Sequence, residues 1–264
     1  VDTLSDLSNL IAYYDFEQTS TTLENQGNYV AGSTFSTGTI ANQIDEPKLT
    51  VKSTSLYDGT DSHTVGGWTS AESSRDSSKD GTNNGATTGQ TGKIGNAWDF
   101  DGSSDDVTTT WGSNWSDEGT VSLWYNADST ANYEALIAQN TGDAFQLRFE
   151  GSDLKIRVGN SGVYTIQSGT NTGNWHNVIV EWDRNANTLN AWYDVTQTIT
   201  NQAHSDWMTS QAWMIGTGVD LTSANRHFDG KIDQVLIYDS TSISVSDIYN
   251  SGSGTATPPT TNLV

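Results

Sequence analysis

The stretch FDGKIDQVLIYDSTSISVSDIYN, residues 228–250, decides the fold class because it reads as a long strand followed by a short helix. Apolar residues fall on both alternating sets of the strand, with Ile232, Leu236 and Tyr238 on one set and Val235 and Ile237 on the other. Strands of this kind are covered on both faces. We therefore predict a strand over residues 228–239 that has protein on both sides, and a short closing helix after it.

Asp233 is an acidic residue in the middle of this apolar strand. Burying an unpaired carboxylate costs several kcal/mol unless a cation or hydrogen bonds compensate for the lost water. A bound metal ion is one candidate for that compensation, and backbone N–H groups are the alternative.

Outward from this stretch, short runs of Val, Ile, Trp, Tyr and Thr recur between clusters of Gly, Asn, Asp and Ser. This pattern is typical of all-β sandwiches. Further strands are predicted near residues 10–16, 96–100, 105–110, 119–126, 133–138, 144–149, 154–158, 162–166, 175–183, 188–194 and 212–216.

Two segments lack this pattern. Residues 32–92 are rich in Ser, Thr, Gly and Asp, and a loop of that length inside a compact domain is functional or has strands of its own. We predict an insertion there, with one hairpin around residues 48–57. The tail at 252–264 has the Gly, Ser, Thr and Pro composition of a flexible linker.

The charge of the chain restricts its partners. Its 264 residues include 32 acidic and 11 basic side chains, which give a formal net charge of −21. The chain has no cysteine. Such a charge disfavours nucleic acid and anionic membrane surfaces as partners and favours cations. No apolar run approaches the length of a membrane span. The chain begins at Val1 without a leader, which fits a processed chain or a piece of a longer one.

Five motifs follow one another along residues 10–250: LIAYYDFEQT with LENQGN, TGKIGNAWDFDGSSDDV, GTVSLWYNAD, GNWHNVIVEWDRNANTLNAWYD and FDGKIDQVLIYDSTSISVSDI. This series resembles the laminin G-like jelly roll of the concanavalin A-like lectin/glucanase superfamily. The resemblance implies an all-β fold, a two-sheet antiparallel jelly-roll sandwich with a short C-terminal helix, as one domain over residues 1–251. The chain departs from the family at Tyr193-Asp194-Val195-Thr196, where Asp-Gly is common.

The same resemblance implies a structural calcium ion. The first strand, the turn after it and the final strand would supply its ligands, which correspond here to Glu17, Glu24, Asn25 and Asp233. Calcium prefers such an oxygen shell. The alternative is that the two glutamates are solvated and Asp233 accepts backbone N–H bonds.

Aromatic residues are the best candidates for ligand contact because sugar C–H faces stack on Trp and Tyr. Several lie at or near predicted turns: Trp68, Trp111, Trp115, Tyr133, Tyr164, Trp207 and Trp213. Trp68 and Trp207 are predicted to be the exposed ligand-binding pair. The alternating carboxylate pattern of the superfamily's glucanases is absent, and Glu181 with Asp183 reads as a pair of rim charges, so we predict that the chain is not an enzyme.

These observations favour an extracellular or cell-surface recognition and adhesion module, stabilised by calcium, that binds glycans or another surface polymer. A structural subunit of a surface layer, filament or virion is the alternative, in which the chain contacts copies of itself or other surface proteins. A polysaccharide-active enzyme is the third hypothesis. The fold does not choose among the three.

Overall fold

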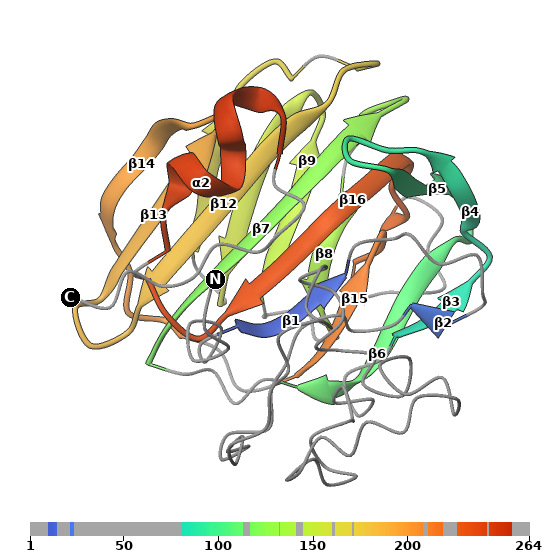
Figure 1. Cartoon of the computed structure of the whole chain (residues 1–264). Coiled ribbons are helices and arrows are strands. Elements are labelled where there is room, and N and C mark those ends of the chain that lie inside the picture. Colours follow the sequence, from blue (N-terminus) through green and yellow to red (C-terminus); the bar gives the residue numbers. More distant parts are fainter. Residues whose placement is uncertain are drawn as a thin grey trace, which may run out of the picture.

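A computed structural model describes residues 10–14, 22–23, 81–112, 117–131, 133–140, 145–159, 162–170, 172–207, 211–218, 226–241 and 243–254. These residues form two antiparallel β-sheets that pack face to face, with a short helix over the outer face of one sheet (Figure 1). The predicted fold class, an all-β jelly-roll sandwich with a short C-terminal helix, is confirmed.

The sheet that carries the helix, called sheet A, has eight strands in the order β14-β13-β12-β7-β16-β5-β4, and β1 also pairs with β16. Their bounds are β14 Thr196–Ala203, β13 Thr188–Tyr193, β12 His176–Asp183, β7 Glu118–Ala127, β16 Asp229–Tyr238, β5 Asn96–Asp101, β4 Thr87–Thr91 and β1 Leu10–Tyr14.

The opposite sheet, called sheet B, also has eight strands, in the order β11-β10-β9-β8-β15-β6-β3-β2. Their bounds are β11 Gly162–Gln167, β10 Asp153–Val158, β9 Gln146–Glu150, β8 Ala135–Gln139, β15 Ala212–Ile215, β6 Asp106–Gly112, β3 Gly81–Asn84 and β2 Thr22–Leu23.

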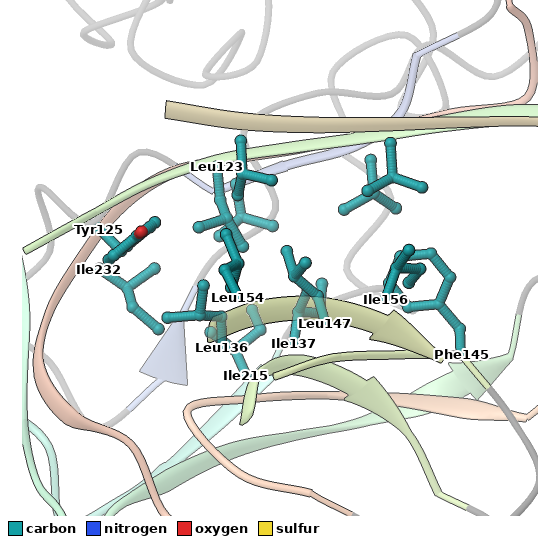
Figure 2. Packing of buried hydrophobic residues seen from close by; sticks show 14 of the residues in the cluster. Leu123, Tyr125, Leu136, Ile137, Phe145, Leu147, Leu154, Ile156, Ile215 and Ile232 are labelled. Carbon is teal, nitrogen blue, oxygen red and sulfur yellow. The ribbon is translucent and has the colours of Figure 1, made fainter. Parts of the chain in front are cut away.

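The main core fills the space between the two sheets. Figure 2 shows Leu123, Tyr125 and Ile232 of sheet A facing a layer of apolar side chains from sheet B, which includes Leu147 and Ile156. Along each strand one alternating set of side chains enters this core, so the other set lies on an outer face. This alternation determines which residues of sheet B are available for a ligand.

The central strand β16 has a β-bulge, because its register against β7 shifts between Asp233 and Leu236 and Gln234 adopts φ 51°. An extra residue at a bulge exchanges the faces of the residues that follow it. Ile232 therefore packs in the main core with Val235 and Ile237. The prediction that Ile232 shares a face with Leu236 and Tyr238 is wrong for this reason.

A second apolar cluster covers the outer face of sheet A. It consists of Ile179, Leu236, Tyr238, Ile243 and Ile248, and the last of these lies in helix α2 (Val245–Tyr249). The 3₁₀ turn η5 (Asn250–Gly252) follows the helix. No helix among the described residues is long and apolar enough to cross a membrane. The sequence predicts that β16 is covered on both faces. Sheet B covers one face, and helix α2 covers the other.

Four strands occur where the sequence predicts none, namely β2, β3, β4 and β14. In β14 only Ile199 is buried, so its residues show no apolar alternation, and β3 and β4 are rich in Thr, Gly and Asn. β3 and β4 lie near the end of the predicted insertion at 32–92 and pair with β6 and β5. The predicted hairpin at 48–57 and residues 255–264 of the predicted linker lie outside the described residues.

Candidate functional site

The outer face of sheet B carries a row of long polar side chains on its neighbouring strands β9 and β10. On β9, Leu147 and Phe149 enter the core, so Arg148 lies on the outer face. On β10, Leu154 and Ile156 enter the core, so Lys155 lies on the outer face and pairs in register with Arg148. Gln146, Glu150 and Arg157 belong to the same outward set.

This face gathers cations in a chain that is otherwise acidic. Of 11 basic residues, Arg148, Lys155 and Arg157 lie on it. Arg226 joins them, since a Cβ atom added at Gly218 would lie 3.3 Å from Cδ of Arg226 and 3.7 Å from Cβ of Ala135. Ala135 pairs with Arg148 in the sheet, so the stem of Arg226 lies beside the same row. A net charge of −21 makes this concentration of positive charge a local exception.

Arg148 is the most buried of these cations, with 4% of the residue exposed. Its Nη1 donates to Oε1 of Gln146 over 2.8 Å, and its Nη2 donates to Oε1 of Glu150 over 2.6 Å. Nε is buried and has no hydrogen-bond partner. Arg148 therefore retains one unsatisfied N–H group. A buried donor without an acceptor costs about 1–3 kcal/mol.

Glu150 is shared between two cations, because Lys155 Nζ donates to its other oxygen over 2.9 Å. Burial opposes ionisation of this carboxyl, but hydrogen bonds from Lys155 and Arg148 outweigh burial and lower the pKa of Glu150. Glu150 is therefore charged at neutral pH and neutralises only one of its two partners. The group of three retains a net positive charge.

Tyr133 lies close to both arginines. Its ring centroid lies 4.8 Å from Cζ of Arg148 and 5.2 Å from Cζ of Arg226, distances at which a cation is attracted to an aromatic ring. The backbone N–H of Tyr133 donates to Phe149 O over 2.8 Å and its φ is 74°, a conformation that is uncommon outside glycine. Tyr133 remains 43% exposed. The fold thus holds an exposed aromatic ring beside two guanidinium groups.

Small or flexible apolar side chains lie next to this row, because Ala135, Ala138 and Met214 form a buried cluster away from the main core. These three residues and Gln146 are buried and support the face from within. An exposed aromatic ring and fixed charges are usual elements of a site that orients a polyhydroxylated ligand. We define the candidate site as Tyr133, Gln146, Arg148, Glu150, Lys155 and Arg226.

Asp233, the predicted calcium ligand, is fully buried on the outer face of sheet A opposite Trp124. The backbone N–H of Ile94 donates to its Oδ2 over 2.9 Å. A Cβ atom at Gly92 would lie 2.8 Å from that oxygen, so glycine allows the 92–95 turn to approach the carboxylate. The N–H alternative is thus observed for one oxygen of Asp233.

The other predicted calcium ligands, Glu17, Glu24 and Asn25, lie outside the described residues. Within the described part of the chain, no group of three or more His, Cys, Asp or Glu residues gathers as a metal site would. The calcium site therefore stays a prediction.

Trp207 is half-buried and packs against the main core. Its Nε1 donates to Oδ1 of Asn187 over 3.2 Å, and its ring lies perpendicular to that of His204 at 4.8 Å. His204 Nε2 faces the carbonyl of Asp206 at 2.8 Å, so this nitrogen carries the proton and Nδ1 accepts from the Tyr164 hydroxyl at 3.1 Å. We call Trp207, Asn187, His204 and Tyr164 the edge cluster. It shares no residue with the candidate site.

The remaining aromatic candidates separate by burial. Trp213 is fully buried in the main core, so its expected place near a ligand is wrong, because β15 turns the ring inward. Tyr133 is exposed, as a turn residue should be. Trp68 lies outside the described residues.

Sequence analysis did not identify Arg148, Lys155 and Arg226 as site residues. A signal was present for the first two, because the polar residues 146, 148, 150, 155 and 157 alternate with apolar residues in two neighbouring strands. Arg226 is distant in sequence and reaches the site only through the topology, which places the segment before β16 beside β8.

Comparisons with known proteins agree with this architecture. The Laminin_G_3 family model, described as concanavalin A-like lectin/glucanases superfamily, matches residues 101–248. No curated protein matches the sequence.

Two solved structures illustrate the likeness. Trypanosoma rangeli sialidase in complex with sialic acid has a TM-score of 0.53 and 10% identity, over 88% of this chain and 31% of the sialidase chain. Domain 4 of AbnA, a GH43 extracellular arabinanase from Geobacillus stearothermophilus, in complex with arabinotriose, has a TM-score of 0.46 and 19% identity, over 60% of this chain and 81% of that one. This chain thus spans about a third of the sialidase.

Proposed function

Because the chain belongs to the concanavalin A-like lectin/glucanases superfamily, we propose that it is a glycan-binding module that acts by recognition without catalysis. The observation that carries the proposal is the outer face of sheet B, where exposed Tyr133 stands beside two arginines and a line of polar side chains. We place this module outside the cell or at its surface, where it serves in adhesion.

Recognition on this face would combine stacking with hydrogen bonds. The Tyr133 ring offers an apolar surface to sugar C–H groups, and Lys155 and Arg226 offer hydrogen-bonding groups to hydroxyls. A shallow face of this kind binds weakly per site, and several copies on one surface would raise the apparent affinity through avidity.

A glycan array followed by calorimetry tests the proposal, with wild type beside Tyr133→Ala and Trp207→Phe. We expect wild type to bind one glycan class and Tyr133→Ala to lose most of that affinity, while Trp207→Phe retains it. Loss in Trp207→Phe alone would move the site to the edge cluster. If no glycan binds to wild type, the proposal fails, and polymers in sedimentation would favour the structural-subunit hypothesis.

We also propose that calcium stabilises the domain through Asp233. The complete burial of this residue supports the proposal. A ligand that binds only the folded state raises the melting temperature by mass action. We expect millimolar calcium to raise the melting temperature of wild type above its value in EDTA.

Asp233→Asn is the matched variant for this experiment, because its carbonyl oxygen still accepts the N–H of Ile94 while the charge is removed. The calcium-dependent rise should disappear in this variant. An equal rise in both proteins would place any calcium elsewhere, and no rise in wild type would leave Asp233 as a hydrogen-bonded carboxylate.

A further inference from the structure

We propose that the saccharide bound by sheet B is an acidic one, whose carboxylate is held between Arg226 and Arg148 beside Tyr133. This inference rests on the proposed function and names the ligand class for the same site. It follows from the charge balance of the face, from the unused donors of the two arginines and from the shape of the guanidinium group.

The charge balance favours an anion. Arg148 and Lys155 share a single carboxylate, Glu150, so one positive charge in that group is not neutralised. Arg226 adds another, because among the described residues its guanidinium group has no ion-pair or hydrogen-bond partner and lies 5.2 Å from the centroid of the Tyr133 ring. With a net charge of −21, the chain repels anions everywhere except where local cations outweigh it.

The acidic residues nearby do not use these cations. Glu134 follows Tyr133 directly, yet its Oε2 accepts the backbone N–H of Ala131 over 3.0 Å. Burial raises the pKa of Glu134, and the charge of Asp229 raises it further. Asp153 contributes a negative charge near Lys155. Among the described residues, however, Glu150 is the one carboxylate that forms an ion pair with Arg148 or Lys155, and none pairs with Arg226.

The donor arrangement fits a carboxylate. A guanidinium group presents a planar fork of N–H donors that matches the two oxygens of a carboxylate, and its charge makes those hydrogen bonds about twice as strong as neutral ones. The Nε–H group of Arg148 is buried without an acceptor. A bound carboxylate would give Arg226 its missing partner and place a negative charge beside Arg148.

The room for this arrangement is built into the backbone. Gly218 leaves space for the stem of Arg226, since a Cβ atom there would come within 3.3 Å of Cδ of the arginine. The backbone of Tyr133 is held by its N–H bond to Phe149 O, and both guanidinium groups lie within 5.2 Å of the centroid of its ring. The two arginines are thus gathered around one ring before a ligand arrives, which lowers the cost of binding.

Matched pairs of saccharides test the inference by calorimetry: oligogalacturonate against its methyl ester, and 3′-sialyllactose against lactose. Each pair keeps most hydroxyls and differs in the carboxylate. We expect at least one acid to bind roughly tenfold or more tightly than its neutral partner, the range that a charged hydrogen bond provides. A higher salt concentration should weaken the binding of the acidic saccharide and leave that of the neutral one unchanged, because salt screens interactions between charges.

Arg226→Gln should lower the affinity for the acid roughly tenfold more than it lowers the affinity for the neutral partner. Arg226→Lys keeps the charge without the fork and should recover only part of the loss. Lys231→Gln is the control, because it also removes one positive charge, but from a half-buried side chain of sheet A whose Nζ lies 3.8 Å from Oδ1 of Asp99. This variant should change neither affinity. Thermal unfolding of each variant verifies that it is folded.

The outcomes separate this inference from the proposed function. Neutral saccharides that bind as well as acids would retain the glycan-binding function and overturn the acidic class. A sulfated galactan oligosaccharide that binds as tightly as the carboxylates, with the same dependence on Arg226, would overturn the carboxylate in favour of any anion. If no saccharide of either kind binds, both proposals fail.

Discussion

Glu181 is a buried carboxyl on the outer face of sheet A, on the far side of the core from the candidate site. Burial raises its pKa from 4.5 to about 7, and the neighbouring charge of Glu118 contributes. The folded state therefore holds a proton that the unfolded chain releases between about pH 4.5 and 7. Stability falls as pH rises through this window, since the group must ionise while buried.

Glu181→Gln removes this titration, and we expect the variant to be more stable than wild type at pH 8 by about 1–3 kcal/mol. At pH 4.5 the two proteins should have similar stability, because Glu181 is protonated there. Urea unfolding across pH 4.5–8 measures the difference. Asp128→Asn is the control, because it also removes one carboxylate, but from an exposed residue. Parallel pH curves for wild type and Glu181→Gln would contradict the assignment.

Residue-level predictions from sequence succeeded where a side chain's surroundings follow from its own strand. The burial of Asp233 is such a case, because apolar residues surround it in sequence. The raised pKa of Glu181 is not such a case, because it depends on burial and on the charge of Glu118 in the neighbouring strand. The segment before α2 also lies here, since Thr120 Oγ1 donates to Ser240 O. The calcium ligands could be inferred only from resemblance.

At the scale of the element, the β13–β14 turn shows a local conflict. Asp194 and Val195 have φ values of 46° and 67°, as in the two-residue hairpin turns that favour Asp-Gly. Asp194 suits its position, because its carboxylate accepts the N–H of Asn177 over 2.8 Å and lies 2.7 Å from Nδ1 of His176. Val195 does not, since a β-branched residue at positive φ is strained.

Val195→Gly should therefore stabilise the domain by about 1 kcal/mol, the cost of the left-handed conformation less the added freedom of glycine when unfolded. Val163 in β11 is equally exposed at 43%, so Val163→Gly is a matched control that should destabilise. Thermal unfolding compares the two. A loss of stability in Val195→Gly would show that the valine side chain contributes more than the strain costs.

The elements also show why sequence prediction was uneven. Strands that enter the core on one or both faces, such as β9, β10 and β12, were predicted within about two residues because apolar alternation marks them. The edge strand β14 was not, because backbone pairing with β13 holds it while most of its side chains face water. A bulge at Gln234 has no sequence signal comparable to Gly or Pro, so the face of Ile232 was predicted wrongly.

At the scale of the whole molecule, the net charge of −21 destabilises the folded state through self-repulsion. Salt shortens the range of that repulsion, to about 10 Å at 0.1 M and about 3 Å at 1 M. We expect the melting temperature at pH 7.5 in EDTA to rise by several degrees between 0.05 and 0.5 M sodium chloride.

The same scan near pH 4.1, the isoelectric point expected from the sequence, provides the comparison, because the net charge there is close to zero. The salt effect should be much smaller at this pH. A melting temperature that is independent of salt at pH 7.5 would mean that the acidic side chains are too widely spaced to repel one another.

The whole-molecule prediction from sequence was right in architecture and incomplete at the site. Five ordered motifs indicate two sheets and a closing helix, and the structure contains them. The positive face emerges only when Arg226, Tyr133 and Arg148 meet across three separate segments, which strand order determines and local patterns do not.

The pairing of β1 with β16 bears on how the domain would respond to mechanical load. Leu10 lies opposite Tyr238 in an antiparallel ladder, so a force that draws these two residues apart acts on the outermost hydrogen bonds first. The bonds would then break one after another, as in a zipper, and not all at once as in shear. A tether pulling in this direction would peel β1 away at low force while the rest of the sandwich stays intact.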